Sequence, residues 1–292
     1  QGSTRRTHSK HPPKALLWAR VAALLCTCTA FSAAAHGGSL PSHVITDWCI
    51  FCWAFGFAFT LLVLLAEAFG FQARVPVSWN NFPITVASYS AHLCLAASIL
   101  FPLTFLRGQT NNMSSEVKGH RVASTVFSCL ATLAYVLEVS LTKARPGEVA
   151  GYMATAPGLL KVCQTTVACV IFIYVSSPVT YDSHPALEWC MAVYCICFIL
   201  SMAVVLMCVG GCTGYLPVPL PKFLSVYALL AVAMYLTATI LWPVFQFSKA
   251  NRNRNRNSRT DLIVVAVLTA VNFLLYLADL AYSARLVFVS VI

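Results

Sequence analysis

The sequence predicts an all-α integral membrane protein whose eight transmembrane helices form two parallel, tandem four-helix bundles, with both chain ends in the cytoplasm. Three observations support this fold class: a low charge content, eight long apolar segments and a repeat. Apolar residues make up 59% of the 292 residues and charged residues only 10%, with a mean hydropathy of +0.76. A soluble domain carries about a quarter charged residues. So few charges cannot cover a water-facing surface, so we expect lipid to be the solvent.

Eight apolar segments are long enough to cross a bilayer, because a transmembrane helix needs about 20 mostly apolar residues. The first segment contains Arg20 and exceeds the apolar core of a signal peptide, so we expect it to stay in the protein as a span. The chain starts at Gln1 rather than Met, which leaves open whether N-terminal residues are missing. The short loops leave no room for a soluble catalytic domain. In chain order, the predicted spans are Ala15–Ala35, Trp48–Phe69, Ile84–Leu106, Val122–Leu141, Leu159–Ser176, Trp189–Val209, Phe223–Phe245 and Leu262–Ala284.

A constant interval relates the two halves of the chain. The stretch DWC at residues 47–49 recurs as EWC at residues 188–190, 141 positions later. The same offset matches residues in all four predicted helices of each half without a gap, which indicates a tandem duplication of a four-helix unit. Further matches at this offset are Arg20 with Lys161, Cys28 with Cys169, Ile99–Pro102 with Ile240–Pro243, Tyr135 with Tyr276, and Glu138 with Asp279.

The repeat predicts three parts of the chain: a basic cytoplasmic tail over residues 1–14, a first four-helix domain over residues 15–147, and a second over residues 148–292. Each copy has an even number of spans, so both copies enter the membrane in the same sense. Inverted repeats of secondary transporters usually need an odd number of spans per copy. The duplication therefore argues against a carrier.

Lysine and arginine residues set the predicted orientation, since cytoplasmic loops carry an excess of both. The basic stretch RRTHSKHPPK precedes the first span, whereas the loops after spans one and five contain neither residue. The loops after spans two, four and six carry Arg74, Lys143 with Arg145, and Lys222. We therefore place both termini in the cytoplasm. The run NRNRNRNSRT at residues 251–260 is an exception, because it holds four arginines on the predicted outer side.

The acid–Trp pairs Asp47-Trp48 and Glu188-Trp189 mark the predicted outer starts of spans two and six. A carboxylate at a helix N-terminus meets the positive end of the helix dipole, and Trp favours the lipid–water interface. We interpret all four residues as interface anchors. A catalytic pair of acids is the alternative, but no residues of matching chemistry accompany them.

Charged residues inside spans are costly and therefore candidates for function. Arg20 and Lys161 lie a turn or more inside the cytoplasmic ends of spans one and five, and Glu138 and Asp279 lie at similar depth in spans four and eight. We expect Arg20 to pair with Glu138 and Lys161 with Asp279, joining the first and last helix of each bundle. The alternative is that the basic side chains extend alone to the headgroups.

Glu67 and His92 have no counterparts in the second half of the chain. Arg74 could reach Glu67 if the helix ends near Gly70, which would make Glu67 structural. A proton- or ion-coupling role is the alternative for this acid. His92 fits either a polar contact between helices or a proton relay.

The thirteen cysteines lie almost entirely within the spans, so a disulfide framework is not expected. The pairs Cys49/Cys52 and Cys195/Cys197 lack the further His or Cys residues of a zinc site, so we predict no metal. Most cysteines are expected to be small packing residues. Palmitoylation is a hypothesis for two cysteines at a cytoplasmic helix end, Cys208 and Cys212.

Three features concern glycans and lipids. Asn112 begins a glycosylation sequon in a predicted outer loop, close to the bilayer. Leu280, Tyr282 and Arg285 fit a proposed cholesterol-contact pattern, although an interfacial Tyr followed by a cytoplasmic Arg explains them equally well. Each basic residue of the N-terminal tail would contribute about 1 kcal/mol toward anionic inner-leaflet lipids. The net charge of +10 does not indicate nucleic-acid binding, because no globular surface remains to hold nucleic acid.

Three stretches carry a family resemblance: FQARVPVSWNNFPIT (71–85), TKARPGEVAGYMATAPGLLK (142–161) and PALEWCMAVYCICFIL (185–200). They resemble the myeloid-associated differentiation marker family, whose members carry two MARVEL domains. The resemblance runs from about residue 15 to the C-terminus. It implies an eight-span plasma-membrane protein associated with cholesterol-rich ordered membrane, and roles in cell spreading, migration and junctional barriers. The short loop before the last span departs from the longer, cysteine-containing loop of the family. The family has no catalytic residues.

Three function classes follow, in order of support. The first is a non-enzymatic membrane organiser without cofactor, which would gather lipids and bind signalling or cytoskeletal adaptors in the cytoplasm. The second is a channel or carrier using Glu67, His92 and the charge pairs as a polar path. The third is an intramembrane enzyme, which lacks a recognisable nucleophile–base arrangement in the sequence. The sequence does not define an oligomeric state.

Overall fold

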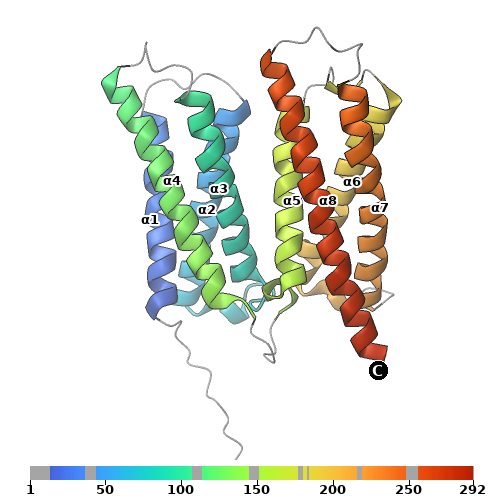
Figure 1. The fold of residues 1–292 in the computed structure, drawn as a ribbon. Coiled ribbons are helices and arrows are strands. Elements are labelled where there is room, and N and C mark those ends of the chain that lie inside the picture. The colour runs from blue at the N-terminus through green and yellow to red at the C-terminus, as the bar shows by residue number, and fades with distance from the viewer. Residues whose placement is uncertain are drawn as a thin grey trace, which may run out of the picture. The chain divides into compact units, whose positions relative to one another are not determined.

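The computed structural model describes residues 14–36, 44–106, 114–144, 151–176, 180–182, 184–215, 219–247 and 256–291 (Figure 1). These residues form eight long α-helices and short 3-10 helices, with no β-strand in the described ranges. The helices are α1 (Lys14–His36), α2 (Val44–Ala68), α3 (Phe82–Phe105), α4 (Ser115–Thr142), α5 (Ala156–Val175), α6 (Pro185–Gly210), α7 (Leu220–Gln246) and α8 (Arg256–Val291).

All eight helices are long and apolar enough to cross a membrane, which confirms the predicted all-helical class and its number of spans. The largest differences from prediction lie in α4 and α8, which extend past the predicted apolar segments. Helix α4 begins with a polar turn in which Ser114 Oγ accepts a hydrogen bond from the backbone N–H of Val117 (3.3 Å). Such a cap satisfies a free N–H of the first turn. A helix can continue beyond the hydrocarbon, so apolar content underestimates its length.

The chain divides into two compact units. Unit 1 comprises Gln1–Phe69 and Leu93–Thr142, and unit 2 comprises Gly70–His92 and Lys143–Ile292. The N-terminal part of α3 and the segment before it therefore belong to unit 2. The division into four-helix domains at residues 147 and 148 stays a prediction, as do their parallel arrangement and the cytoplasmic placement of both termini.

In unit 1, helix α1 packs against both α2 and α4. The contact face of α1 is lined by small side chains, with Ala23 and Ala30 fully buried. Small residues allow close approach of helices in lipid, where packing rather than water exclusion favours association. Between α2 and the C-terminal part of α3, the rings of Trp53 and Phe101 meet edge to face, with centroids 5.3 Å apart.

In unit 2, helices α5 to α8 close into a ring of neighbours: α5 packs against α6 and α8, and α7 packs against the same two helices. Their core combines aliphatic side chains with several large aromatic rings. Four large rings are almost completely buried there: Tyr194, Tyr235, Trp242 and Tyr276.

Backbone conformation also recurs at the 141-residue interval. Gly70 and Gly211 follow α2 and α6, and they are the two described residues with positive φ, at 68° and 70°. The left-handed region favours glycine because it has no Cβ, and it is a common way to end a helix. A 3-10 helix follows each glycine, over Phe71–Ala73 and Cys212–Tyr215.

Candidate functional site: buried charge clusters

A cluster of three charged side chains lies inside unit 1. Arg20 of α1 donates through Nη1 to Glu67 Oε2 of α2 (2.5 Å) and through Nε to Glu138 Oε1 of α4 (2.6 Å). The side chains of Arg20, Glu67 and Glu138 are 2%, 12% and 4% exposed. The planar guanidinium presents several donors at once, so one arginine can serve two carboxylates.

Glu67 binds Arg20, and not Arg74, which was the partner considered possible if the helix ended near Gly70. Glu67 lies in the last turn of α2 and binds Arg20. Arg74 is exposed and follows the turn made by Gly70 and the 3-10 helix. The prediction missed that Glu67 faces α1, because the repeat offers no equivalent acid to compare.

The equivalent cluster of unit 2 has one acid. Lys161 Nζ of α5 binds Asp279 Oδ2 of α8, and both side chains are buried. Gln164 Nε2 donates to the same oxygen (3.2 Å). The ammonium lies 4.6 Å from the centre of the Tyr227 ring and 5.7 Å from that of Tyr276, distances at which a ring face attracts a cation.

The two clusters differ in formal charge. In unit 1 two carboxylates share one cation, whereas in unit 2 the position equivalent to Glu67 is Cys208, so the pair is neutral. The type of cation in each cluster suits the number of acids. The guanidinium of Arg20 can bind two carboxylates at once, whereas the ammonium of Lys161 acts as a point charge beside one. The excess acid of unit 1 is therefore a departure from the repeat.

Hydroxyl and indole groups repeat between the units as well. In unit 1, Tyr135 hydroxyl donates to Gly56 O at 2.9 Å and lies 2.8 Å from Thr60 Oγ1. The corresponding contacts of unit 2 join Tyr276 to Cys197 O and Ser201 Oγ. The 141-residue offset matches the tyrosines, and the hydroxyl residues Thr60 and Ser201 at the same offset are a signal that could have predicted one contact in each unit. A second equivalent pair of contacts joins Trp53 with Ser128 and Tyr194 with Thr269.

The contacts of Asn81 join segments that no sequence pattern brought together. Its Nδ2 donates to Cys208 O (2.9 Å), and its Oδ1 accepts from the backbone N–H of Met153 (3.1 Å). A Cβ at Gly151 would come within 2.1 Å of Asn81 Oδ1, so any larger residue there would displace the Asn81 side chain. This contact joins two of the stretches that carry the family resemblance. Nearby, burial raises the pKa of the Tyr152 phenol.

His92 of α3 lies beside Cys163 of α5, a contact within unit 2. The distance from His92 Nε2 to Cys163 Sγ is 3.0 Å, and His92 Nδ1 lies 2.7 Å from Ser88 O. No pattern in the sequence pairs these two residues, which are 71 positions apart. Glu67 and His92 belong to different units, and each has its own partners.

The predicted interface anchors occupy the expected helix starts. Asp47 and Glu188 are exposed in the first turns of α2 and α6. Trp189 is 44% exposed and donates through Nε1 to Thr237 Oγ1 (2.9 Å), whereas Trp48 is half-buried. Their role at a lipid–water interface stays a prediction.

The two cysteines considered for palmitoylation differ in access. Cys208 is 1% exposed and packs in the core of unit 2, which does not suit a thiol that must reach an acyl donor. Cys212 is exposed in the turn after α6.

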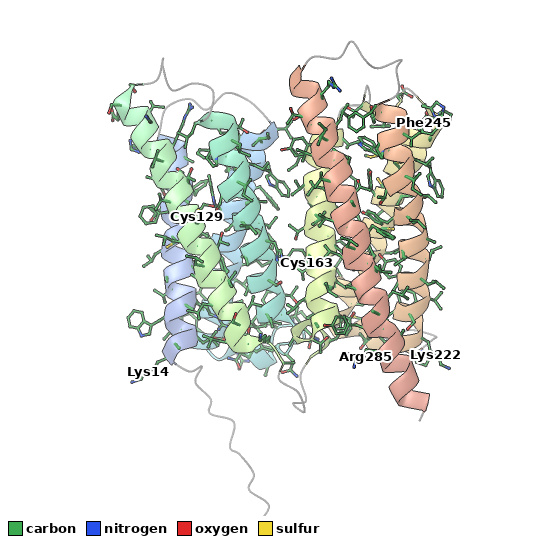
Figure 2. All side chains as sticks on the ribbon, viewed as in Figure 1. Lys14, Cys129, Cys163, Lys222, Phe245 and Arg285 are labelled. Carbon is green, nitrogen blue, oxygen red and sulfur yellow. The ribbon has the colours of Figure 1, made fainter. Side chains whose placement is uncertain are left out.

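The residues of the cholesterol pattern do not share one face of α8. Tyr282 and Arg285 are exposed and three positions apart, so they are neighbours on the helix surface. Leu280 is half-buried, and residues two apart on a helix do not face the same side. Arg285 lies toward the C-terminal end of α8 (Figure 2).

Some predictions fall outside the described residues. They concern the sequon at Asn112, the tail over residues 1–13, and most of the Asn-Arg run at residues 251–257. Within the described ranges, no group of three or more His, Cys, Asp or Glu residues could hold a metal ion.

Eight apolar helices with charges paired between them define a multi-pass membrane protein. Residues 152–282 match the MARVEL membrane-associating domain. The chain is 50% identical over 287 residues to a myeloid-associated differentiation marker homolog of Xenopus laevis, which covers 93% of this chain and 92% of that relative.

Two human proteins give a similar result. The chain is 47% identical to myeloid-associated differentiation marker of Homo sapiens, over 93% of this chain and 88% of the relative. It is 41% identical to myeloid-associated differentiation marker-like protein 2 of Homo sapiens, over 93% of this chain and 91% of the relative. The chain belongs to the myeloid-associated differentiation marker family. No solved structure matches it.

Proposed function

We propose that this protein organises cholesterol-rich, ordered domains of the plasma membrane without catalysing a reaction, and thereby takes part in cell spreading, migration or junctional barriers. The observation that carries this proposal is the separation of polar and apolar groups. The charged side chains inside the spans are buried and form ion pairs between helices. Arg20 binds Glu138, and Lys161 binds Asp279.

The outward faces of the helices are apolar and available to lipid. Leu133 of α4, Ile199 of α6 and Val226 of α7 are 65%, 63% and 70% exposed. A contiguous apolar surface on a membrane protein contacts acyl chains or sterol. The exposed pair Tyr282 and Arg285 on α8 would add a polar contact for a sterol hydroxyl, since Tyr and Arg near a helix end favour the interface.

The cytoplasmic partners in this proposal are anionic inner-leaflet lipids and signalling or cytoskeletal adaptors. The basic residues that precede α1 would attract the lipids, at about 1 kcal/mol for each residue near the surface.

Fractionation in cold detergent tests the proposal on the full-length protein in cells. We expect the protein to lie in the detergent-resistant fraction. It should leave this fraction after cholesterol depletion and return to it when cholesterol is restored. Restoration with epicholesterol, whose hydroxyl has the opposite configuration, is the control and should be less effective. A uniform distribution that does not depend on sterol would contradict the proposal.

A channel or carrier is the second candidate, and one observation favours it. Glu67 gives the unit 1 cluster one acid more than the repeat requires. An excess charge in a span is a recurrent feature of ion paths. We expect no ion or proton flux from the protein in liposomes, because Arg20 already binds both Glu67 and Glu138. A flux that Glu67→Gln abolishes would place this function first.

A further inference from the structure

His92 has a defined proton arrangement. The carbonyl oxygen of Ser88 can only accept a hydrogen bond, so His92 Nδ1 carries the proton and donates it at 2.7 Å. The opposite nitrogen, Nε2, then has a free lone pair, and it lies 3.0 Å from Cys163 Sγ. With a neutral ring in this tautomer, the thiol is the donor and Nε2 the acceptor.

We propose that Cys163 and His92 form a nucleophile–base pair that makes Cys163 a site of covalent modification by membrane-dissolved α,β-unsaturated carbonyl compounds of the fatty-acid class. The arrangement has three parts: a thiol, a base within hydrogen-bond reach, and a group that orients the base. Cys163, His92 and the Ser88 carbonyl supply them in that order.

The repeat indicates that the pair is not needed for folding. At the 141-residue offset, Cys163 corresponds to Ala22 and His92 to Ala233. The four-helix unit is therefore built with alanine at both equivalent positions. The contact adds chemistry that the repeated fold does not require.

The position of the pair selects the class of reagent. Cys163 lies partway along α5 (Figure 2), about 10 Å from the start of that helix at 1.5 Å per residue. His92 lies about 15 Å from the start of α3 by the same measure. Both side chains are half-buried and so keep some accessible surface. A charged reagent is excluded from hydrocarbon at this depth, whereas an alkenal with an acyl chain dissolves there.

The reaction balances without a co-reactant. Cys163 Sγ forms a bond to the β-carbon, the carbon–carbon π bond opens, and the thiol proton passes to His92 Nε2. The imidazolium then gives this proton to the α-carbon, which yields a thioether and restores the neutral ring. Nothing is oxidised or reduced. Reactant and product are both neutral, so the low dielectric of the membrane does not oppose the overall step.

The test uses the full-length protein in phosphatidylcholine–cholesterol vesicles and an alkyne-tagged 4-hydroxynonenal, with adducts located by peptide mass spectrometry. Cys169 is the matched control, because it is half-buried on the same helix. We expect Cys163 to react at least ~10-fold faster than Cys169, below the usual range for general-base catalysis because the site is apolar. Equal rates would overturn the proposal.

Two variants and a second reagent complete the test. His92→Ala and His92→Gln should lower the rate at Cys163 to that of Cys169 and leave Cys169 unchanged; an unchanged rate at Cys163 in either folded variant would also overturn it. A membrane-impermeant maleimide should label exposed Cys212 and spare Cys163. Labelling of both at equal rates would contradict the location in hydrocarbon. This inference does not depend on sterol binding.

Discussion

Arg20 and Lys161 occupy equivalent positions, yet their chemistry differs in a way that follows their partners. Arg20 donates from two nitrogens to acids on two other helices, whereas Lys161 directs one ammonium at Asp279. In a medium of low dielectric, breaking such a contact leaves an uncompensated charge, which is strongly unfavourable. These clusters therefore stabilise the packing of their helices, because moving the helices apart would leave unpaired charges in the membrane.

A charge exchange tests the unit 1 contact. Glu138→Lys places a cation beside Arg20 and is expected to lower the free energy of unfolding by about 3–5 kcal/mol, the loss typical of a broken buried pair. Adding Arg20→Glu restores opposite charges and should recover part of this loss. Thermal unfolding of the detergent-solubilised protein measures both variants. A double variant no more stable than Glu138→Lys would argue against the pairing.

Glu67 and Arg74 allow a matched comparison. Glu67→Ala leaves the Arg20 Nη1 donor without its partner, and the expected loss is about 1–3 kcal/mol. Arg74→Ala alters an exposed side chain and should change stability by no more than ~0.5 kcal/mol. Melting temperatures of the two variants give the answer. Equal losses of stability in the two variants would indicate that Glu67 also binds Arg74.

Contacts between individual residues could be predicted from the sequence only where both residues have an equivalent 141 positions away. Opposite charges at matched depth paired Arg20 with Glu138, and the structure contains this contact, while its contribution to stability stays a prediction. Glu67 and His92 have no second copy, so nothing in the sequence indicated which helix each one faces. The nucleophile–base contact of His92 and Cys163 was missed for the same reason.

The sequence predicted which segments form membrane-spanning helices better than it predicted where each helix begins and ends. Apolar length predicts a span, because only a helix of about 20 residues satisfies its backbone across hydrocarbon. Ends depend on local caps, such as Ser114 before α4 and Gly211 after α6, and these lie outside the apolar pattern. The connecting segments were not predictable, because Asn81 joins Met153 and Cys208 over long sequence separations.

The packing at the start of α5 requires a glycine. A Cβ at Gly158 would lie 2.4 Å from Tyr152 O and 2.6 Å from Met153 Cα, which are backbone atoms that cannot rotate away. Gly158→Ala is expected to lower stability by about 1–3 kcal/mol through overpacking. The control is Gly119→Ala in α4, where nothing lies within 4 Å of the added Cβ.

Gly119→Ala should be neutral or stabilise by up to ~1 kcal/mol, since alanine favours helix over glycine. Thermal unfolding distinguishes the two glycines. A stable Gly158→Ala variant would show that the connection before α5 is displaced at little cost, and that the close contact is not needed.

For the whole molecule, an even number of spans requires both termini on one face of the membrane. The residues before α1 carry the basic excess, so that face should be cytoplasmic. Epitope tags at each end should therefore bind antibody only after cells are permeabilised. A tag in the loop at residues 37–43 should bind on intact cells and serves as the control. Antibody binding to one terminal tag on intact cells would contradict the predicted topology.

We propose that the apolar exterior binds sterol, and photocrosslinking with a diazirine cholesterol analogue in cell membranes measures this binding at individual residues. We expect saturable crosslinks on exposed residues of the helices, including the α8 surface around Tyr282, that unlabelled cholesterol competes away. Crosslinking that does not saturate, and that a photoreactive phosphatidylcholine reproduces at the same residues, would contradict the claim.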